Sequence, residues 1–453
     1  MSQRCLLIAD DLTGGADAGA QFAKRGLRTL LISLLEDAKI DFSKYTHQDV
    51  LVINTDSRGL SPEKAFFKVS NLLKRFGYKL FPIIYKKIDS TLRGNVGYEI
   101  DAILKETNGS LCFMAPTYPE QKRTLVGGIL IVGEKPLALT EVARNTSSPI
   151  QESHVYKILQ NQSHNKVGWI DLTHVASTRE GLQRTVEMER RKGNRIIIFD
   201  AVSRQDLKNI ADVGFSVEKK PIFVGSAGLA EEVAKKLTLS KTKASQKMKA
   251  FNHILIVSGT ASSITHQQLK QVEKRSIPSF QLTPSLILGE DAKADRERKD
   301  LSTRIANSLS QGINILKTPS EMLDSKESTG HPIHLKITKA LASVALWALE
   351  ASKIDPHDLA LILTGGETAQ HVINGLKTEG IEIEGELLEG IVRGHLIGGN
   401  WDGLTVVTKA GAFGKENALE KIVRMLEMGS PSTKEEKNEG LNQRQTYQGG
   451  KFH

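Results

Sequence analysis

Short apolar runs recur along the chain, and each is followed by a turn rich in glycine, hydroxyl or charged residues and then by an amphipathic stretch. Such runs are typical of strands buried on both faces of a parallel sheet, with helices between them. Ligands of these sheets bind at the carboxyl ends of the strands, so the turns after the runs are the candidates for function. The pattern predicts strands at Leu6 to Ala9, Val50 to Asn54, Ile83 to Tyr85, Leu111 to Met114, Ile196 to Phe199, Ile222 to Val224, Ile254 to Val257, Leu359 to Leu363 and Leu404 to Val407.

Two or three domains are expected, because 453 residues exceed what one hydrophobic core usually serves. Residues 236–251 are rich in lysine and poor in apolar side chains, as in a linker. We predict a first domain at 1–235, a basic linker at 236–251, a second domain at 252–428 and a disordered polar tail at 429–453. Each domain is expected to be of the α/β class, with a mostly parallel sheet flanked by helices.

Two segments depart from the simple alternation of strand and helix. The turn-rich residues 126–137 predict a hairpin that leaves the first sheet and forms a wall of its cleft. A long amphipathic stretch, about Ile337 to Ser352, predicts a helix that covers the second sheet.

The formal net charge of +9 raises the question of nucleic acid binding. Much of the excess comes from lysines around the linker, and no aromatic residues are interleaved with them to stack on bases. A solvated linker explains these lysines better than a binding patch, so we predict no nucleic acid partner. They are Lys235, Lys236, Lys241, Lys243, Lys247 and Lys249.

Cysteine usage and hydropathy indicate the compartment. Cys5 and Cys112 are far apart and form no CxxC pair, which favours a reducing cytoplasm and argues against a zinc site. The first apolar run is too short for a signal peptide, and no run approaches the roughly 20 residues of a membrane span. We expect a cytoplasmic protein without a membrane partner, and a homodimer is the default expectation for its assembly.

Three turns in the first domain concentrate charged and hydroxyl groups. Asp10 and Asp11 follow the first predicted strand, Arg58 follows the second, and Lys86 to Asn95 follows the third. A helix start offers free N–H groups to an anion, and an arginine fork can pair with a carboxylate. Each aspartate could instead cap a helix, and Arg58 could form a surface ion pair. The density of charge in Lys86 to Asn95 favours a ligand.

Three further turns in the second domain are built from small residues. Their backbone N–H groups can form anion-binding concavities, and a lysine in the last turn could supply the charge that phosphates require. None of them fits the GxxxxGK[ST] or GxGxxG patterns, so the residues indicate a phosphate or nucleotide site without identifying the nucleotide. The turns begin at Ser258, Thr364 and Lys409.

Eight segments, taken in order, resemble those of the four-carbon acid sugar kinase family: IADDLTGGADAGAQFAKRG, INTDSR, YKKIDSTLRGN, APTYPEQKRT, VGSAGLAEE, VSGTASSITHQQL, LTGGETA and VVTKAGAFG. The resemblance covers roughly residues 4 to 422. It implies an ATP-dependent enzyme that phosphorylates the C4 hydroxyl of a tetronate, most readily D-threonate or D-erythronate. It also implies that the first domain binds the acid, the second binds ATP, and the reaction takes place in the cleft between them.

The resemblance assigns roles to individual residues. Asp11 or Asp89 is expected to accept the hydroxyl proton, and Lys409 with Mg²⁺ to stabilise the transferring phosphoryl group. The sequence identifies no metal ligands. The implied substrate contacts are Asp10, Asp11, Arg58, Lys87, Ile88, Asp89 and Ser90. The implied nucleotide contacts are Ser258, Thr364, Gly365, Gly366, Glu367, Lys409, Ala410, Gly411, Ala412, Phe413 and Gly414.

Two groups of alternatives stay open at this point. The substrate could be 3-oxo-tetronate or another small hydroxy acid such as glycerate, because the orientation of one hydroxyl is read by pocket geometry. The same pocket could also serve a sensor that binds a sugar acid without catalysis. The crowded turn at Lys86 to Asn95 argues against the sensor.

Overall fold

The structure is a computed structural model that describes residues 4–33, 42–45, 47–76, 78–109, 111–144, 149–238, 248–260, 262–318, 331–411 and 413–429. Most of the predicted tail, the middle of the predicted linker and Ala412 lie outside the described residues. The N-terminal half contains β1 (Cys5–Ala9), β2 (Thr29–Ser33), β3 (Val50–Asn54), β4 (Ile83–Lys87), β5 (Cys112–Ala115), β9 (Val167–Ile170), β10 (Ile196–Phe199) and β11 (Ile222–Gly225). The C-terminal half contains β12 (His253–Ser258), β13 (Ser279–Gln281), β14 (Ile313–Lys317), β15 (Leu359–Thr364), β16 (Gly380–Leu388), β17 (Ile391–Ile397) and β18 (Thr405–Lys409).

In the described part of the chain these strands form one 15-stranded sheet, in the order β13-β14-β12-β15-β18-β17-β16-β2-β3-β1-β4-β11-β5-β10-β9. All pairs between strands of the N-terminal half in this large sheet are parallel, as are the pairs among β12, β13, β14, β15 and β18. The two-domain α/β prediction is therefore confirmed, and each half has its own mostly parallel sheet.

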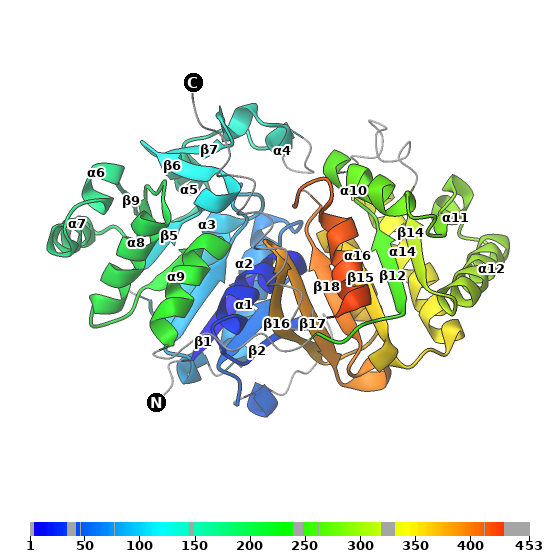
Figure 1. The fold of residues 1–453 in the computed structure, drawn as a ribbon. Coiled ribbons are helices and arrows are strands. Elements are labelled where there is room, and N and C mark those ends of the chain that lie inside the picture. Colours follow the sequence, from blue (N-terminus) through cyan, green and yellow to red (C-terminus); the bar gives the residue numbers. More distant parts are fainter. Residues whose placement is uncertain are drawn as a thin grey trace, which may run out of the picture.

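The two parallel sheets are joined edge to edge, which the sequence analysis did not predict. The long strands β16 and β17 pair antiparallel with each other, β17 pairs with β18, and β16 pairs with β2. The joint with β2 is short and consists of Ile381 opposite Leu31, Glu382 opposite Leu30 and Ile383 opposite Thr29. In Figure 1, β16 and β17 lie in the centre of the molecule, between the two halves.

Helices cover both faces of the sheet (Figure 1). One core cluster runs through both halves beneath α1, α7, α8, α9, α12, α14 and α15. A second lies beneath α2, α3 and α5, and a third lies beneath α10 and α16. The bounds are α1 (Leu12–Ala23), α2 (Pro62–Arg75), α3 (Val96–Thr107), α4 (Glu141–Arg144), α5 (Val155–Gln162), α6 (Leu172–Val175), α7 (Arg179–Arg191), α8 (Arg204–Ser216), α9 (Ala227–Leu237), α10 (Ser263–Glu273), α11 (Pro284–Leu288), α12 (Ala292–Leu309), α14 (His331–Ser352), α15 (Gly366–Gly375) and α16 (Ala418–Met428).

The predicted hairpin is present above the carboxyl ends of the first sheet. Strands β6 (Arg123–Val126), β7 (Ile129–Val132) and β8 (Lys135–Pro136) form a separate small sheet. Gly127 and Gly128 make its first turn with positive φ angles of 59° and 74°, which glycine adopts without strain. Asp200, at the end of β10, accepts hydrogen bonds from both turn N–H groups at 2.7 and 3.1 Å. This carboxylate therefore fastens the hairpin to the sheet.

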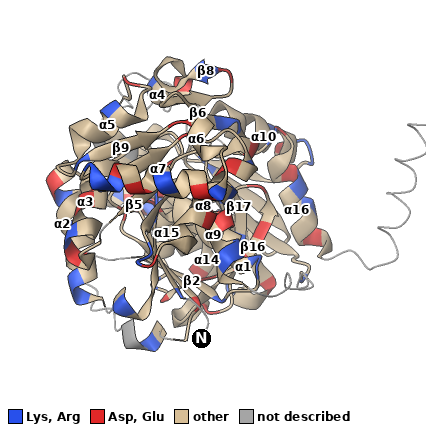
Figure 2. Cartoon of the chain, turned by 90° about the vertical axis from the view of Figure 1, so that its left-hand side faces the viewer, with Lys and Arg blue, Asp and Glu red and all other residues tan. Residues whose placement is uncertain are grey.

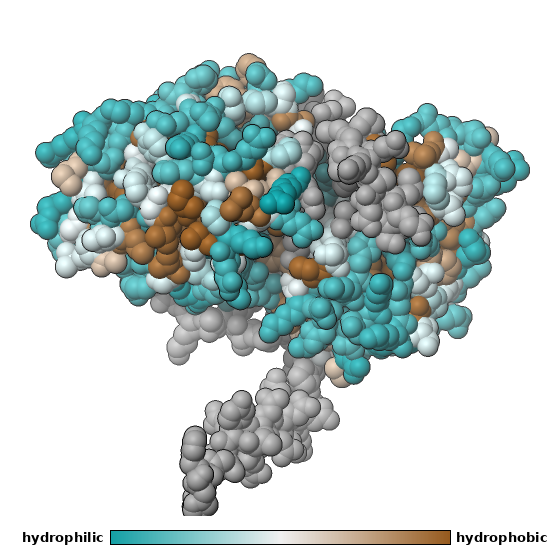
Figure 3. All heavy atoms as spheres, turned by 90° about the horizontal axis from the view of Figure 1, so that it is seen from above, coloured by the Kyte–Doolittle hydropathy of each residue, from teal (hydrophilic) through white to brown (hydrophobic). Residues whose placement is uncertain are grey.

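Charge is distributed over the surface in both signs. The α7 helix carries arginines and glutamates side by side in Figure 2, and Figure 3 shows mostly hydrophilic residues over both lobes. Three lysines of the basic stretch are described, and each pairs with a carboxylate: Lys235 with Glu232, Lys236 with Asp212 and Lys249 with Asp358. No described helix is long and apolar enough to cross a lipid bilayer.

The α1 helix packs closely on β16 at the joint between the two halves, so a change in α1 can test how much this joint contributes to stability. A Cβ atom added at Gly19 would lie 2.6 Å from Cδ1 of Ile383 in β16. Gly19→Ala should therefore lower thermal stability, although alanine normally favours a helix by about 1 kcal/mol over glycine. Adding Ile383→Val removes the clashing methyl group, so the double variant should recover part of the melting temperature lost by Gly19→Ala. Strictly additive effects of the two changes would contradict this account.

Candidate active site

The predicted residues of the first domain lie at the carboxyl ends of neighbouring strands. Ala9 at the end of β1 lies opposite both Asn54 of β3 and Lys87 of β4. The residues that follow these positions must therefore share one edge of the sheet. Asp10 and Asp11 leave β1 there, Arg58 follows β3, and Lys87 is itself the last residue of β4.

Arg58 holds the two aspartates together. Its Nε and Nη2 atoms donate to the two oxygens of Asp10 at 2.8 and 3.0 Å, and Nη2 also donates to Oδ1 of Asp11 at 2.7 Å. Burial raises the pKa of Asp10, but Arg58, Lys86 and Lys87 outweigh it and hold the pKa below its ordinary value. The predicted proximity of these three residues is thus found, but the fork of Arg58 is already occupied by protein carboxylates.

Asp11 also caps α1, as the alternative interpretation of this turn proposed. Its Oδ1 accepts from the N–H of Gly14 at 3.1 Å, and its Oδ2 accepts from the hydroxyl of Thr13 at 2.9 Å. Capping and ligand binding are compatible here, because a helix start that is capped by a carboxylate still presents the other free N–H groups.

The crowded turn after β4 satisfies most of its charges internally. The ammonium of Lys86 is fully buried and pairs with the buried Glu99. Arg93 binds both oxygens of Asp89 at 2.6 and 3.0 Å. Burial acts to raise the pKa of Asp89, yet Arg93, Arg58 and the Thr91 hydroxyl hold it well below its usual range. A carboxylate held in this way is a weak proton acceptor, which argues against Asp89 as the base.

Lys87 is a cation of this turn that has no carboxylate partner among the described residues. It is only 4% exposed, and its Nζ donates to the carbonyl of Ile88 at 2.9 Å. It forms no ion pair with any carboxylate of the described residues. The neighbouring Ile88 contributes little to a ligand site, because its side chain lies in the core and its N–H bonds to Gly225. Ser90 is buried at the same turn.

The predicted nucleotide residues also lie in one row. Ser258 of β12 is opposite Thr364 of β15, which is opposite Lys409 of β18. The Thr364 hydroxyl donates to Oγ of Ser258 at 2.8 Å. Gly365 then turns the chain into α15 with a φ of 95°, a conformation that favours glycine, and its N–H bonds to the carbonyl of Lys409 at 3.0 Å. The three turns therefore form one contiguous surface.

Lys409 is a second buried cation without a carboxylate partner among the described residues. Its Nζ donates to Oγ1 of Thr265 and to the carbonyls of Ala410 and Gly411 at 3.0 to 3.3 Å. Burial lowers the pKa of Lys409 to about 7. An anion beside it would favour the charged form, which is what a phosphate group supplies. Gln268 of α10 holds the rest of this turn by donating to the carbonyls of Phe413 and Lys415.

The two groups of turns meet at the joint between the halves. A Cβ atom added at Gly366 would lie 3.1 Å from Oδ2 of Asp11, so the first turn of α15 approaches the first turn of α1. Arg123 of the hairpin lies over the ring of Phe413 at 5.2 Å. These two contacts show that the two groups of turns lie close together, and Glu367 continues α15 as an exposed residue.

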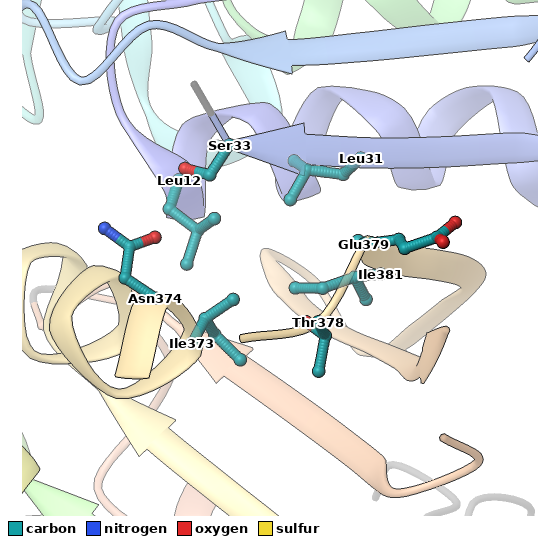
Figure 4. Close-up of a pocket in the computed structure, with 9 residues that line it drawn as sticks. Leu12, Leu31, Ser33, Ile373, Asn374, Thr378, Glu379 and Ile381 are labelled. Carbon is teal, nitrogen blue, oxygen red and sulfur yellow. The ribbon is translucent and has the colours of Figure 1, made fainter. Parts of the chain in front are cut away.

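The joint itself is tightly packed. Figure 4 shows Leu12 and Leu31 of the first half facing Ile373 and Ile381 of the second. The cavity between them measures about 20 Å³. That volume suits a single water molecule and is far below the few hundred cubic ångströms of a small-molecule site. The joint therefore holds the halves together and does not bind the substrate.

Two residues of the site were missed by the sequence analysis. Asp17 is 8% exposed, and its Oδ1 has no hydrogen-bond partner among the described residues. Arg123 has buried Nε and Nη1 atoms that likewise lack partners in the described part of the chain. Both residues lie within the quoted segments, Asp17 three residues after Gly14 and Arg123 at the start of the hairpin. Their place in these segments was the only signal in the sequence. Their burial and their lack of hydrogen-bond partners could be learned only from the structure.

Comparison with known proteins identifies the family. A model of sugar-binding N-terminal domains matches residues 5–233, and a model of nucleotide-binding C-terminal domains matches residues 255–419. A D-threonate kinase of Salmonella typhimurium is 30% identical over 428 residues, which cover 92% of this chain and 96% of that protein. The chain belongs to the four-carbon acid sugar kinase family. Its resemblance to that family is thereby confirmed.

Other relatives of this sugar acid kinase carry different substrate names. A D-erythronate kinase of Heliobacterium modesticaldum is 29% identical over 91% of this chain and 94% of that protein. A 3-oxo-tetronate kinase of Burkholderia multivorans is 25% identical over 93% and 96%. A solved structure from Salmonella typhimurium LT2 has a TM-score of 0.76 at 20% identity and covers 93% of this chain and 99% of that one. The structure of protein HI1011 of Haemophilus influenzae has a TM-score of 0.70 at 22% identity and covers 93% of this chain and 100% of that one. These two structures support the fold alone.

The Arg58 fork generates a prediction about stability and pH. Arg58→Met should destabilise the kinase by about 3 to 5 kcal/mol at pH 8, because it leaves buried carboxylates unpaired. Without the arginine, the pKa of Asp10 in the folded protein rises above its unfolded value, so the penalty grows as pH rises and shrinks as the carboxyl protonates. Melting temperatures at pH 5 and pH 8 test this, with the exposed Arg190→Met as a control that should change little. An equal loss at both pH values would contradict the role given to Arg58.

Proposed function

We propose that this protein is an ATP-dependent kinase that phosphorylates the C4 hydroxyl of a four-carbon sugar acid, with D-threonate or D-erythronate as the preferred substrate. The observation that carries the proposal is the meeting of two different turn sets, one with a buried free cation at Lys87 and one with a row of small residues ending at Lys409. Each set has one buried ammonium that lacks a carboxylate partner in the described residues. A reaction between two anions requires such an arrangement, with one cation for each reactant.

The acid-binding wall would hold the substrate through Lys87. Its ammonium can neutralise the sugar acid carboxylate, and the start of α1 beside it can donate to an anion or hydroxyl. The predicted contact of Arg58 with the substrate stays a prediction, and in the structure its Nε and Nη2 atoms bind Asp10 and Asp11. We assign Arg58 to positioning these two carboxylates at the edge of the site.

The nucleotide wall would hold ATP through the turns at Ser258, Thr364 and Lys409. The N–H groups at the start of α15 and the ammonium of Lys409 would bind phosphate oxygens. Among the described residues no cluster of three or more His, Cys, Asp or Glu side chains could hold a metal by itself. Mg²⁺ in kinases is held largely by phosphates and needs only one or two carboxylates, so the site fits an ion that arrives with ATP. Glu367 in the first turn of α15 would hold it, and the ion would offset charge on the phosphates.

A substrate panel tests the proposed function. Purified protein should release ADP with D-threonate or D-erythronate, and kcat/KM for the preferred tetronate should exceed that for glycerate by at least about tenfold, since a missing hydroxyl leaves buried polar groups unpaired. 3-Oxo-tetronate and C5 and C6 sugar acids complete the panel. Activity confined to glycerate would move the assignment to another hydroxy acid. Ligand binding without any ADP release would favour the sensor.

Substitution of the two lysines tests the division of labour. Lys87→Met should raise KM for the sugar acid by about 10- to 100-fold while ATP affinity, measured by calorimetry, stays within about threefold, because it removes a charge partner from one wall only. Lys409→Met should do the reverse. Lys208→Met removes an exposed cation that pairs with Asp212 and serves as the control. If either lysine variant weakened both ligands equally, the two-wall assignment would be wrong.

A further inference from the structure

Asp17 is a buried carboxylate in the middle of α1 that the proposed function does not use. It is 8% exposed, and its Oδ1 accepts no hydrogen bond from any described residue. An unpaired buried polar atom is costly, so such atoms are concentrated where a ligand or water completes them. Asp17 lies one helical turn after Gly14, on the same face of α1.

The position of Asp17 relates it to both walls of the site. A Cβ atom added at Gly14 would lie 3.0 Å from Nζ of Lys87, so this face of α1 borders the acid-binding cation. Arg123, another charged neighbour of Asp17, lies over Phe413 of the nucleotide-binding turn. Two guanidinium nitrogens of Arg123 also lack partners among the described residues. Asp17 and Arg123 therefore have opposite charges and unsatisfied polar atoms. They lie between Lys87 on the acid-binding side and Phe413 on the nucleotide-binding side.

Three other aspartates of the site are engaged by the protein. Both oxygens of Asp10 bind Arg58, and both oxygens of Asp89 bind Arg93. Asp11 accepts from Arg58, Thr13 and the N–H of Gly14. Within the described site, Asp17 thus retains a carboxylate oxygen that can accept a proton from a ligand.

We propose that Asp17 is the general base of the reaction, a role that rests on the proposed kinase function. Its Oδ1 takes the proton of the C4 hydroxyl as the hydroxyl oxygen forms a bond to the γ-phosphorus of ATP. The bond between that phosphorus and the β–γ bridging oxygen breaks, and ADP leaves with the electron pair. Asp17 then releases the proton to solvent, so the products are the 4-phosphate, ADP and one proton.

The electrostatics of Asp17 suit this role. Burial raises the pKa of Asp17 to about 7, Lys87, Arg123 and Lys24 act to lower it, and Glu386 acts to raise it. A base works best when its pKa lies near the operating pH. Because the ionised form is active, kcat/KM for the sugar acid should rise with pH up to about 7 and level off above it. The titratable groups that face Asp17 are Lys87 of β4, Glu386 of β16, Arg123 of β6, Lys24 after α1, and Tyr85 and Tyr118.

The experiment compares pH profiles of kcat/KM for the preferred tetronate at saturating ATP. Asp17→Asn should reduce kcat by about 10² to 10⁴-fold, its residual activity should lack the acid limb near pH 7, and its ATP affinity should stay within about threefold. Glu386→Gln should move the limb to lower pH, because it removes the charge that raises the pKa of Asp17. Asp212→Asn, which changes a half-buried carboxylate of α8 that pairs with Lys208 and Lys236, is the matched control and should keep the wild-type profile.

Each outcome decides between the two claims. Loss of the acid limb in Asp17→Asn together with the shift in Glu386→Gln supports the base. An Asp17→Asn variant with kcat within about threefold of wild type, or with residual activity that keeps the limb, would overturn it. If Asp17→Asn does not fold, an unmoved limb in Glu386→Gln overturns the proposal by itself. A wild-type protein that phosphorylates no sugar acid would instead refute the proposed function, whatever the variants do.

Discussion

The pairing of β16 with β2 is the contact on which the geometry of the site depends. Three residue pairs make it in the described part of the chain, and they join two parallel sheets into one continuous sheet. The α1 helix packs across the joint, and Gln370 of α15 donates to Ser33 at the end of β2 at 2.7 Å. Because ligand-binding turns follow the carboxyl ends of parallel strands, fixing one sheet against the other also fixes one set of turns against the other. The proximity of Gly366 to Asp11 is a direct result.

Charge pairing within this frame separates structural residues from candidate ligand-binding residues. Lys86 pairs with Glu99, Arg58 with Asp10 and Asp11, and Arg93 with Asp89, so these groups are neutralised before any ligand arrives. Lys87 and Lys409 are 4% and 0% exposed and bind only neutral oxygens among the described residues. Burying an unpaired charge is unfavourable, and an anionic ligand relieves the penalty. One such cation on each side of the joint is the arrangement that two anionic reactants need.

Much of the fold follows from the sequence because buried parallel strands have a strong signal. The continuous apolar runs, such as Val50 to Asn54 and Ile196 to Phe199, became strands with the predicted bounds. By contrast, β16 alternates isoleucine with glutamate, as a half-exposed strand does, and it was missed because only continuous runs were counted. The joint was missed with it, because pairing between distant strands depends on tertiary contacts that no local pattern encodes.

The sequence predicted the positions of the turns better than the bonding partners of the charged residues in them. Strand ends and glycines located the turns that follow the strands, because those features are local, and ligand binding by these turns stays a prediction. The choice of partners is not local, so the bonds of Arg58 and Asp89 to protein groups could not be predicted from the sequence. Conversely, Asp17 looked like an ordinary helical residue until its burial and its free oxygen were known. A charged residue acquires its role from the groups around it, and those groups come from several strands.

Hydrogen–deuterium exchange with each ligand added separately tests the central claim most directly. The account predicts that a saturating tetronate slows amide exchange chiefly at 10–17 and 87–94. It predicts that a nonhydrolysable ATP analogue slows exchange chiefly at 258–260, 365–368 and 409–411. Protection of the same half of the chain by both ligands would contradict the assignment of one reactant to each half.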